Sequence, residues 1–321
     1  MSFEIKKYNP KLESEWNKFI SASQNATFLH NREYMDYHKH RFDDFSLMIY
    51  KKTNLLAVLP AHKINDVIFA HKGLTYADFL FHKKLKTAHK VEIMAASMKY
   101  LKQQGFKTMQ IKIIPSIFHR NANEINSYIY TQMGARLILM KPFFMFDTQN
   151  PYKVNQSRQQ SIDKLEKEPL SIDENGDLEA FWKIVNKNLA VRHNTKPVHN
   201  IDEIKLLKNR FEENIRLYSI SLSGKMLAGV LIFLINDSMH FQYIQATNDE
   251  KYRNAVDILT DFVIKKYYDK VRYISFGSSD STDNSLQAGL VYWKESFGAK
   301  SVNQMFFEVD IENYKKLADI L

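Results

Sequence analysis

The chain has 321 residues, of which 45% are hydrophobic, 13% aromatic and 25% charged, and it contains no cysteine. This composition excludes a disordered protein, a disulfide scaffold, cysteine-ligated zinc and a thiol nucleophile, and the length favours two domains over one. The formal net charge of +9 indicates anionic partners such as phosphates, nucleotides or RNA, although a lysine-rich composition without such a role gives the same charge.

No apolar run approaches the length of a membrane-spanning helix, and the first residues lack the basic and then apolar layout of a signal peptide. We therefore expect a cytoplasmic protein without a transmembrane segment. Peripheral association with a membrane stays open, and the sequence does not predict an oligomeric state.

The first half of the chain alternates strands and helices. Runs of apolar and β-branched residues predict strands at 3–8, 47–50, 55–60, 67–71, 109–114 and 138–146. Apolar residues at helical spacing predict helices at 12–22, 91–101 and 126–133. The second and third of these strands form a hairpin pattern, because only four polar residues separate them.

The second half repeats this order after a polar, largely helical connector at 148–169. Helices are expected at 178–188, 202–210, 255–262 and 286–297, and strands at 217–221, 227–235, 238–246, 272–276 and 302–309. The segment 188–200 is expected to be an irregular loop.

Several residues recur at a constant offset. Ala57, Ile64-Asn65-Asp66 and Asp78 recur 171 residues later, at Ala228, Ile235-Asn236-Asp237 and Asp249. Gly134-Ala135 recurs 164 residues later, at Gly298-Ala299. A shared offset across several elements indicates a duplicated unit. We therefore predict a first unit at 1–147, a helical connector at 148–169 and a second unit at 170–321.

The stretch 273–298 carries the strongest functional pattern. It consists of a strand, a polar loop rich in Gly, Ser, Asp and Asn, and a helix with Leu286, Leu290, Trp293 and Phe297 on one face. Gly298 follows as a helix C-cap. A polar loop before a helix N-terminus is able to present N–H groups to a ligand, although it is also an ordinary connection.

This stretch resembles a known family. Phe276-Gly277-Ser278 and Leu290–Gly298 are similar to the Phe-Gly…Phe-Lys-x-x-Phe-Gly signature of the tandem FemAB-like branch of GNAT-type N-acyltransferases. The segment 188–199 is also similar to uncharacterised bacterial members, many of which are found near polysaccharide genes. The resemblance covers nearly the whole chain and implies an α/β (α+β) fold. Its two tandem GNAT-like units would each hold a mixed, mostly antiparallel sheet flanked by helices.

The resemblance implies an N-acyltransferase that moves an acyl group from acetyl-CoA or another acyl-CoA to an amine of an amino sugar, peptide or cell-envelope precursor. One alternative is transfer from aminoacyl-tRNA, which part of the branch uses. A further alternative is a non-catalytic RNA- or nucleotide-binding protein on the same fold. No DNA partner is implied. The glycine-rich coenzyme A loop of ordinary GNAT enzymes is missing at 251–257, which favours the tRNA alternative.

Three residues are candidates for catalysis through this resemblance. Lys294 would contact donor phosphate or the developing oxyanion, and Tyr292 would protonate the leaving group. His199 would take a proton from the acceptor amine. A solvated lysine, a packing tyrosine and a structural histidine are the corresponding alternatives.

Further candidates surround these three. Those expected to bind the donor are Tyr243, Gln245, Tyr252, Arg253, Asn254 and Ser278, and those expected to bind the acceptor are His71, Lys72, Tyr76, Arg158, Arg192 and His193. Alternation along 239–245 predicts Phe241, Tyr243 and Gln245 on one face of a strand, lining a cleft. No spacing indicates a metal site.

Overall fold

The computed structural model describes residues 3–121, 123–193, 195, 197–279 and 285–320, apart from the side chains at 192 and 193. Contacts divide the chain into two compact units, one formed by Met1–Lys141 with Asn303–Leu321 and the other by Pro142–Val302. Strands β9 (Arg136–Asp147) and β15 (Lys300–Asp310) each contain residues of both units. The sequence-based boundaries at 147 and 170 stay a prediction.

The first unit contains two groups of strands. One group has the order β1 (Glu4–Lys7), β3 (Leu47–Lys51), β4 (Asn54–Leu59), β7 (Leu80–Phe81), and the other has the order β15, β8 (Thr108–Lys112), β6 (Val67–Phe69), β5 (His62–Ile64), β2 (Asp43–Asp44). Strands β6 and β8 are parallel, and the other pairs described here are antiparallel.

The first unit also contains α-helices and 3₁₀ helices. They are η1 (Pro10–Leu12), α1 (Glu13–Ala22), η2 (Phe28–His30), α2 (Arg32–Met35), η3 (Asp36–Arg41), α3 (Thr87–Gln103), η4 (Ser116–Phe118), α4 (Ile125–Gln132) and the C-terminal η5 (Ile311–Asp319). Helix α3 packs against η5. Buried Met109 and Ile111 of β8 alternate with half-buried Gln110 and Lys112, so one face of this strand is less completely covered than the other.

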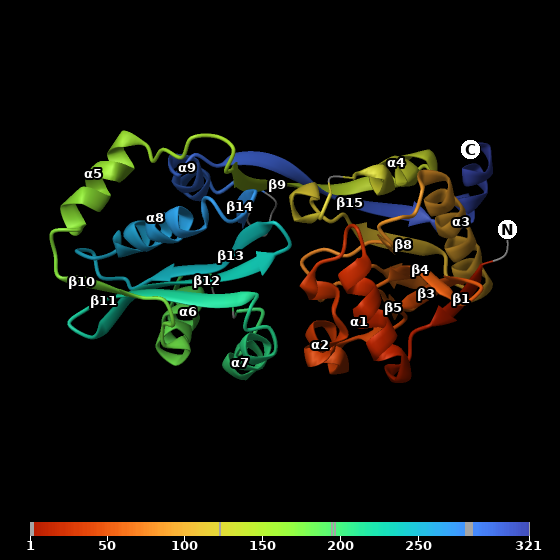
Figure 1. Cartoon of the computed structure of the whole chain (residues 1–321), viewed down its shortest axis with the longest axis horizontal. Coiled ribbons are helices and arrows are strands. Elements are labelled where there is room, and N and C mark those ends of the chain that lie inside the picture. Colours follow the sequence, from red (N-terminus) through yellow and green to blue (C-terminus); the bar gives the residue numbers. More distant parts are fainter. Residues whose placement is uncertain (1–2, 122, 194, 196, 280–284, 321) are drawn as a thin grey trace. The chain divides into compact units, whose positions relative to one another are not determined.

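The second unit is one mixed sheet with helices on both faces. Its strands have the order β10 (Leu170–Asp173), β11 (Ile215–Leu222), β12 (Lys225–Ile235), β13 (Ser238–Ala246), β14 (Tyr273–Ser278) and the C-terminal part of β9. Figure 1 shows α8 (Ala255–Tyr267) on one face and α6 (Leu178–His193) with α7 (Ile201–Arg210) on the other. Helices α5 (Gln156–Leu165) and α9 (Ala288–Ser296) complete the unit. Among the strand pairs described in this unit, β13 and β14 pair in parallel and the others are antiparallel.

The repeat predicted from the sequence is visible in the backbone. Asn65 and Asn236 both adopt positive φ, at 53° and 51°, in the tight turns β5–β6 and β12–β13. Gly134 and Gly298 both follow a helix, with φ of 73° and 82°. The strand after each Asn turn pairs in parallel with the strand that follows the next long helix: β6 with β8 after α3, and β13 with β14 after α8. The predicted fold class is therefore confirmed.

Two local predictions are wrong. Helix α6 continues to His193, so the segment 188–200 is not an irregular loop from its first residue. The face of α9 expected to be buried is buried only at its C-terminal end, because Phe297 is inaccessible while Leu286 and Leu290 are 57% and 37% exposed. The polar loop predicted before α9 includes 280–284, which lie outside the described residues.

Candidate functional site

A cavity of about 650 Å³ lies in the second unit, where the two parallel strands separate. β13 pairs with β14 from Ser238 to His240, at the start of both strands, whereas β14 pairs with β9 on its other side from Tyr273 to Ser278. The later residues of β13, the first turn of α8 and one side of α9 line the space that opens between the strands. The candidate site is this cavity.

Lys294 is a buried cation at the wall of the cavity. Its side chain is on α9 and is 3% exposed, so the alternative of a solvated lysine is wrong. Its Nζ donates hydrogen bonds to the carbonyl oxygens of Gly277 and Ser278, at 2.9 and 2.5 Å. These bonds fix the ammonium group at the end of β14, beside the cavity and 5.5 Å from the ring centre of Phe144.

A second polar group in the wall is built around Asp257 of α8. Its carboxylate accepts a 2.6 Å hydrogen bond from Arg158 and a 2.8 Å bond from the indole N–H of Trp293. Arg158 also donates to the hydroxyl of Ser296 at 3.1 Å. Buried charges are stable when paired and hydrogen-bonded in this way. The ion pair holds α5 and α9 against the first turn of α8.

The sequence did not reveal Asp257 and Trp293 as site residues. Both lie within apolar helical patterns and look like ordinary members of amphipathic helices. The one available signal was a carboxylate on the apolar side of α8, since a buried acidic residue requires a partner. Arg158, Arg253, Asn254, Gln245 and Ser278 all line the same cavity. Their expected roles, acceptor binding for Arg158 and donor binding for the other four, stay predictions.

The turn at 249–254 and the start of α8 use much of their own hydrogen-bonding capacity. The N–H groups of Tyr252, Ala255 and Asp257 donate to carbonyl oxygens within the turn, and that of Lys251 donates to the carboxylate of Asp249. The side-chain amide of Asn254 donates to Ser161 at 2.7 Å. Tyr252 packs on the core of the unit. Fewer backbone amides therefore remain for a phosphate than in a glycine-rich loop.

The predicted alternation along β13 is wrong. The register with β12 shifts between Leu231 and Ile232, so Gln242 is an additional residue in β13. Phe241 stacks on Phe276 at the cavity side, whereas Tyr243 packs edge-on against Trp182 of α6 on the opposite face. The bulge therefore separates two residues that the sequence placed on one face.

Other predicted residues lie away from the cavity lining. The hydroxyl of Tyr292 is exposed and contacts the hydroxyl of Ser157 at 3.2 Å. His199 is buried and contacts the hydroxyl of Tyr243 at 2.9 Å through Nδ1. Burial raises the pKa of Tyr243 to about 12. The side chains of Arg192 and His193 lie outside the described part of the chain.

The remaining three candidates belong to the first unit. His71 and Tyr76 are buried, and Lys72 is exposed with its Nζ 3.7 Å from the ring centre of Phe69. Burial lowers the pKa of His71 far below its ordinary value and raises the pKa of Tyr76. Of these three side chains, only that of Lys72 is accessible to a ligand.

A buried histidine adjoins the cavity wall. His240 contacts the hydroxyl of Ser275 at 3.1 Å and stacks on Phe143. Burial and the nearby ammonium of Lys294 lower the pKa of His240 to about 3. Its imidazole is therefore neutral at physiological pH, and Lys294 carries the positive charge beside it.

The arrangement of the second unit defines the class of protein. A mixed sheet with a parallel pair of strands, a bulge in the strand beside the opening and a helix starting at that opening are features of the GNAT fold. The chain has the fold of the GNAT-type, FemAB-like proteins, with two such units in tandem.

Solved structures agree with this assignment. The chain is similar to FemX, with a TM-score of 0.65 at 10% identity over 98% of this chain and 99% of that one. It is similar to L-PGS from Bacillus licheniformis, with a TM-score of 0.56 at 9% identity over 95% and 92% of the two chains. A tandem GNAT protein from the clavulanic acid biosynthesis pathway gives 0.53 at 10% identity over 97% and 99%.

No family model and no curated protein sequence matches the chain. In the described ranges, no helix is both long and apolar enough to cross a membrane. In the same ranges, no group of three or more His, Asp or Glu residues is arranged to hold a metal ion.

Proposed function

We propose that the protein is an acyltransferase that moves an acyl or aminoacyl group from an activated donor to an amine. The observation that carries this proposal is the cavity between β13 and β14, with the buried ammonium of Lys294 at its wall. The donor would bind there, and the acceptor would be an amine of an amino sugar, a peptide or a cell-envelope precursor in the cytoplasm.

In the proposed reaction, the neutral amine attacks the carbonyl carbon of the donor. A tetrahedral intermediate forms, and its oxygen carries the negative charge. Lys294 is suited to stabilise this charge because its Nζ is held by two carbonyl oxygens and needs little reorganisation. The donor bond then breaks, and the leaving group takes up a proton. Roles for His199 in accepting the amine proton and for Tyr292 in supplying the leaving-group proton stay predictions.

The first candidate donor is an acyl-CoA. Arg253 at the cavity would meet its phosphates, while Phe276, Leu290 and Trp293 would contact its apolar arm. The volume of about 650 Å³ is in the range of small-molecule sites.

The second candidate donor is an aminoacyl-tRNA. It is favoured by the first turn of α8, where bulky residues replace glycine and several backbone N–H groups already have acceptors within the turn. A pyrophosphate held by backbone amides needs small residues and unused donors. An RNA end held by arginine side chains needs neither small residues nor unused backbone donors.

Titration with coenzyme A, acetyl-CoA and bulk tRNA, followed by calorimetry and thermal shift, tests the donor. Binding of coenzyme A species alone supports the first candidate, and binding of tRNA with donor-dependent transfer supports the second. Binding of RNA with no transfer to a panel of amino sugars and peptides would instead support a non-catalytic RNA-binding protein. If none of the ligands binds, the proposal fails.

Lys294→Met should lower the transfer rate about a hundredfold or more, because it removes a charge-stabilising donor, with a smaller effect on donor affinity. Arg253→Ala should mainly weaken donor binding. Lys251→Ala is the matched control, because Lys251 is an exposed neighbour that pairs with Glu168 at 3.3 Å. Full activity of a folded Lys294→Met variant would remove this residue from the mechanism.

A further inference from the structure

The second unit contains another cavity, on a different face of α5 from the donor cavity between β13 and β14. Its volume is about 770 Å³, within the usual range of small-molecule sites. The α5 residues in its wall have the spacing of one helical face, and they are Gln156, Gln159, Gln160 and Asp163. Arg158 of the same helix lines the donor cavity instead, and Ser161 accepts a hydrogen bond from Asn254 on that side. Helix α5 therefore has a different face toward each cavity.

A buried carboxylate fixes the opposite wall of this cavity. Asp261 of α8 is 4% exposed, and it accepts a 2.9 Å hydrogen bond from the hydroxyl of Tyr152. The Nζ of Lys265, one turn later in α8, lies 2.6 Å from the same carboxylate. Because Tyr152 belongs to the segment that leads into α5, this contact ties that segment to α8 and holds the wall in place.

The charges in the wall cancel. It contains two lysines, Lys153 and Lys265, and two aspartates, Asp163 and Asp261. Asp261 is paired with Lys265, and Asp163 accepts a 2.7 Å hydrogen bond from the side-chain amide of Gln159. An ionic ligand of either sign would meet charges of its own sign as well as opposite ones, so it would gain little net attraction.

Side-chain amides provide most of the unused hydrogen-bonding capacity. Gln156 and Gln160 are exposed at the cavity, and their side chains make no hydrogen bond within the described residues. Each amide offers two N–H donors and an acceptor oxygen, and each aspartate keeps further acceptor positions. Hydroxyl groups both donate and accept, so they match this mixture. Tyr152 and Val154 add apolar surface to the same wall.

We propose that this cavity binds a neutral sugar residue, either as a free saccharide or as one unit of a glycan chain. Gln156 and Gln160 would bond to neighbouring hydroxyl groups of the sugar, and Asp261 would accept from another. The ring of Tyr152 would contact the apolar face of the sugar ring. The site does not depend on the proposed transfer reaction, because the two cavities share no lining residue.

Calorimetry and saturation-transfer NMR test the site, with glucose, N-acetylglucosamine and the linear trisaccharide of each as probes. We expect at least one of these sugars to bind, with an affinity that added salt leaves unchanged, because no net charge is involved. A trisaccharide that binds more tightly than its monosaccharide identifies a glycan chain as the source of the ligand. Equal affinities identify a free saccharide.

Gln156→Leu and Gln160→Leu should each weaken sugar binding roughly three- to tenfold, as expected for loss of a neutral hydrogen bond. Both glutamines are exposed on α5, so the fold should stay intact. Lys164→Leu is the matched control, because Lys164 is an exposed residue of the same helix outside the cavity wall.

Arg253→Ala separates this cavity from the donor cavity. Sugar binding that is lost in Arg253→Ala but unchanged in both glutamine variants would overturn the proposal without touching the proposed transferase function, since the sugar would then bind in the donor cavity. Failure of all four sugars to bind would also overturn it. If glutamate or lysine binds more tightly than the sugars, the inference of a neutral ligand is wrong.

Discussion

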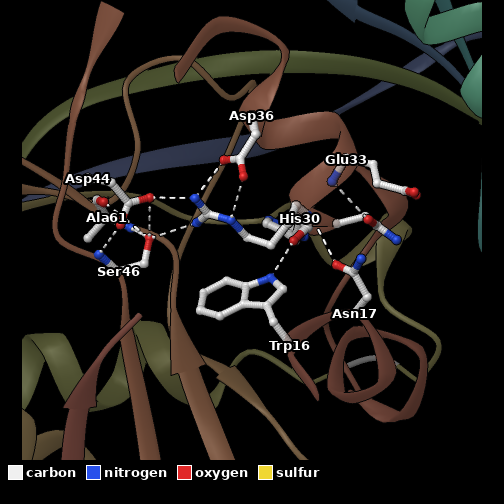
Figure 2. A network of polar contacts seen from close by, with 10 residues as sticks. Trp16, Asn17, His30, Glu33, Asp36, Asp44, Ser46 and Ala61 are labelled. Atoms are coloured by element: carbon white, nitrogen blue, oxygen red, sulfur yellow. Dashed lines mark hydrogen bonds and ion pairs between the residues drawn. The ribbon is translucent and has the colours of Figure 1, made fainter. Parts of the chain in front are cut away.

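At the scale of single residues, one buried guanidinium of the first unit pairs with carboxylates from two other elements. Arg32 of α2 is 3% exposed and donates to Asp36 at 2.6 Å and to Asp44 at 2.7 Å (Figure 2). Its guanidinium also lies 3.9 Å from the ring centre of Tyr8 and 5.4 Å from that of Trp16. Because the two carboxylates come from η3 and β2, this cation ties three elements together.

Replacing this cation leaves two partly buried carboxylates facing each other. We expect Arg32→Met to lower the free energy of unfolding by about 3 kcal/mol, since removing one partner of a buried ion pair leaves its charge uncompensated. Urea unfolding measures the change. Lys39→Met, at an exposed position of η3, is the control and should be neutral. An unchanged urea midpoint for Arg32→Met would show that the network contributes nothing to stability.

At the scale of elements, the sequence predicts what depends on neighbours along the chain. The hairpins β3–β4 and β11–β12 and the strand β13 were predicted within about two residues, because turn residues and apolar alternation are local signals. Strands β2 and β7 were missed, since each has only two residues. The bulge at Gln242 was also missed, because it depends on the register with β12.

The candidate site follows the same rule. Arg253, Asn254 and Ser278 could be predicted from the family resemblance, because they flank a strand or helix end. The pairing of Arg158 with Asp257 joins residues 99 positions apart, and no local pattern contains it. Tyr292 precedes Trp293 by one residue and lies outside the cavity lining, because adjacent helical residues point in directions about 100° apart.

Close packing between β12 and α6 gives an element-scale prediction. A Cβ at Gly229 would lie 2.2 Å from the ring of Phe181, which is fully buried and has no room to move. Gly229→Ala should therefore lower the stability by about 2 kcal/mol through overpacking. Gly289→Ala in α9 is the matched control, because a Cβ there meets nothing within 4 Å and a helical Gly→Ala change is neutral or stabilising.

Chemical denaturation of both variants measures this difference. The double variant Gly229→Ala, Phe181→Leu should recover part of the loss, since a smaller side chain makes room for the added methyl group. Equal stability of the two single variants would contradict the tight contact between β12 and α6.

At the scale of the whole molecule, the two units differ in their buried histidines. In the first unit, burial lowers the pKa of His30, His62 and His119 to about 4, and that of His71 also falls far below its ordinary value. In the described part of the second unit, burial lowers the pKa of His240, to about 3. In the first unit, burial raises the pKa of Asp78 to about 6, and this shift has the opposite effect on how stability depends on pH.

The sign follows from proton binding. A histidine with a lowered pKa binds fewer protons when folded, so its stabilising contribution is complete above pH 6.5 and is lost as the pH falls toward about 4. Asp78 contributes stability below its unfolded pKa, and this is lost as the pH rises through about 6. Burial also raises the pKa of Asp36, in the same direction as that of Asp78. Since four histidines oppose these two carboxyl groups, the net effect of acid on the first unit should be destabilising. Each proton bound only on unfolding costs about 1.4 kcal/mol per pH unit.

We therefore expect the first unit to open at higher pH than the second during acidification from pH 7 to pH 4. Hydrogen exchange followed by mass spectrometry measures this, because peptides of each unit report separately. His62→Phe should move the opening of the first unit to lower pH, since it removes one titrating group from a ring cluster with Phe42 and Phe69. His40→Phe, at an exposed position of η3, should leave the opening pH unchanged. Loss of protection in the second unit first would show that buried histidines do not control the acid stability of this protein.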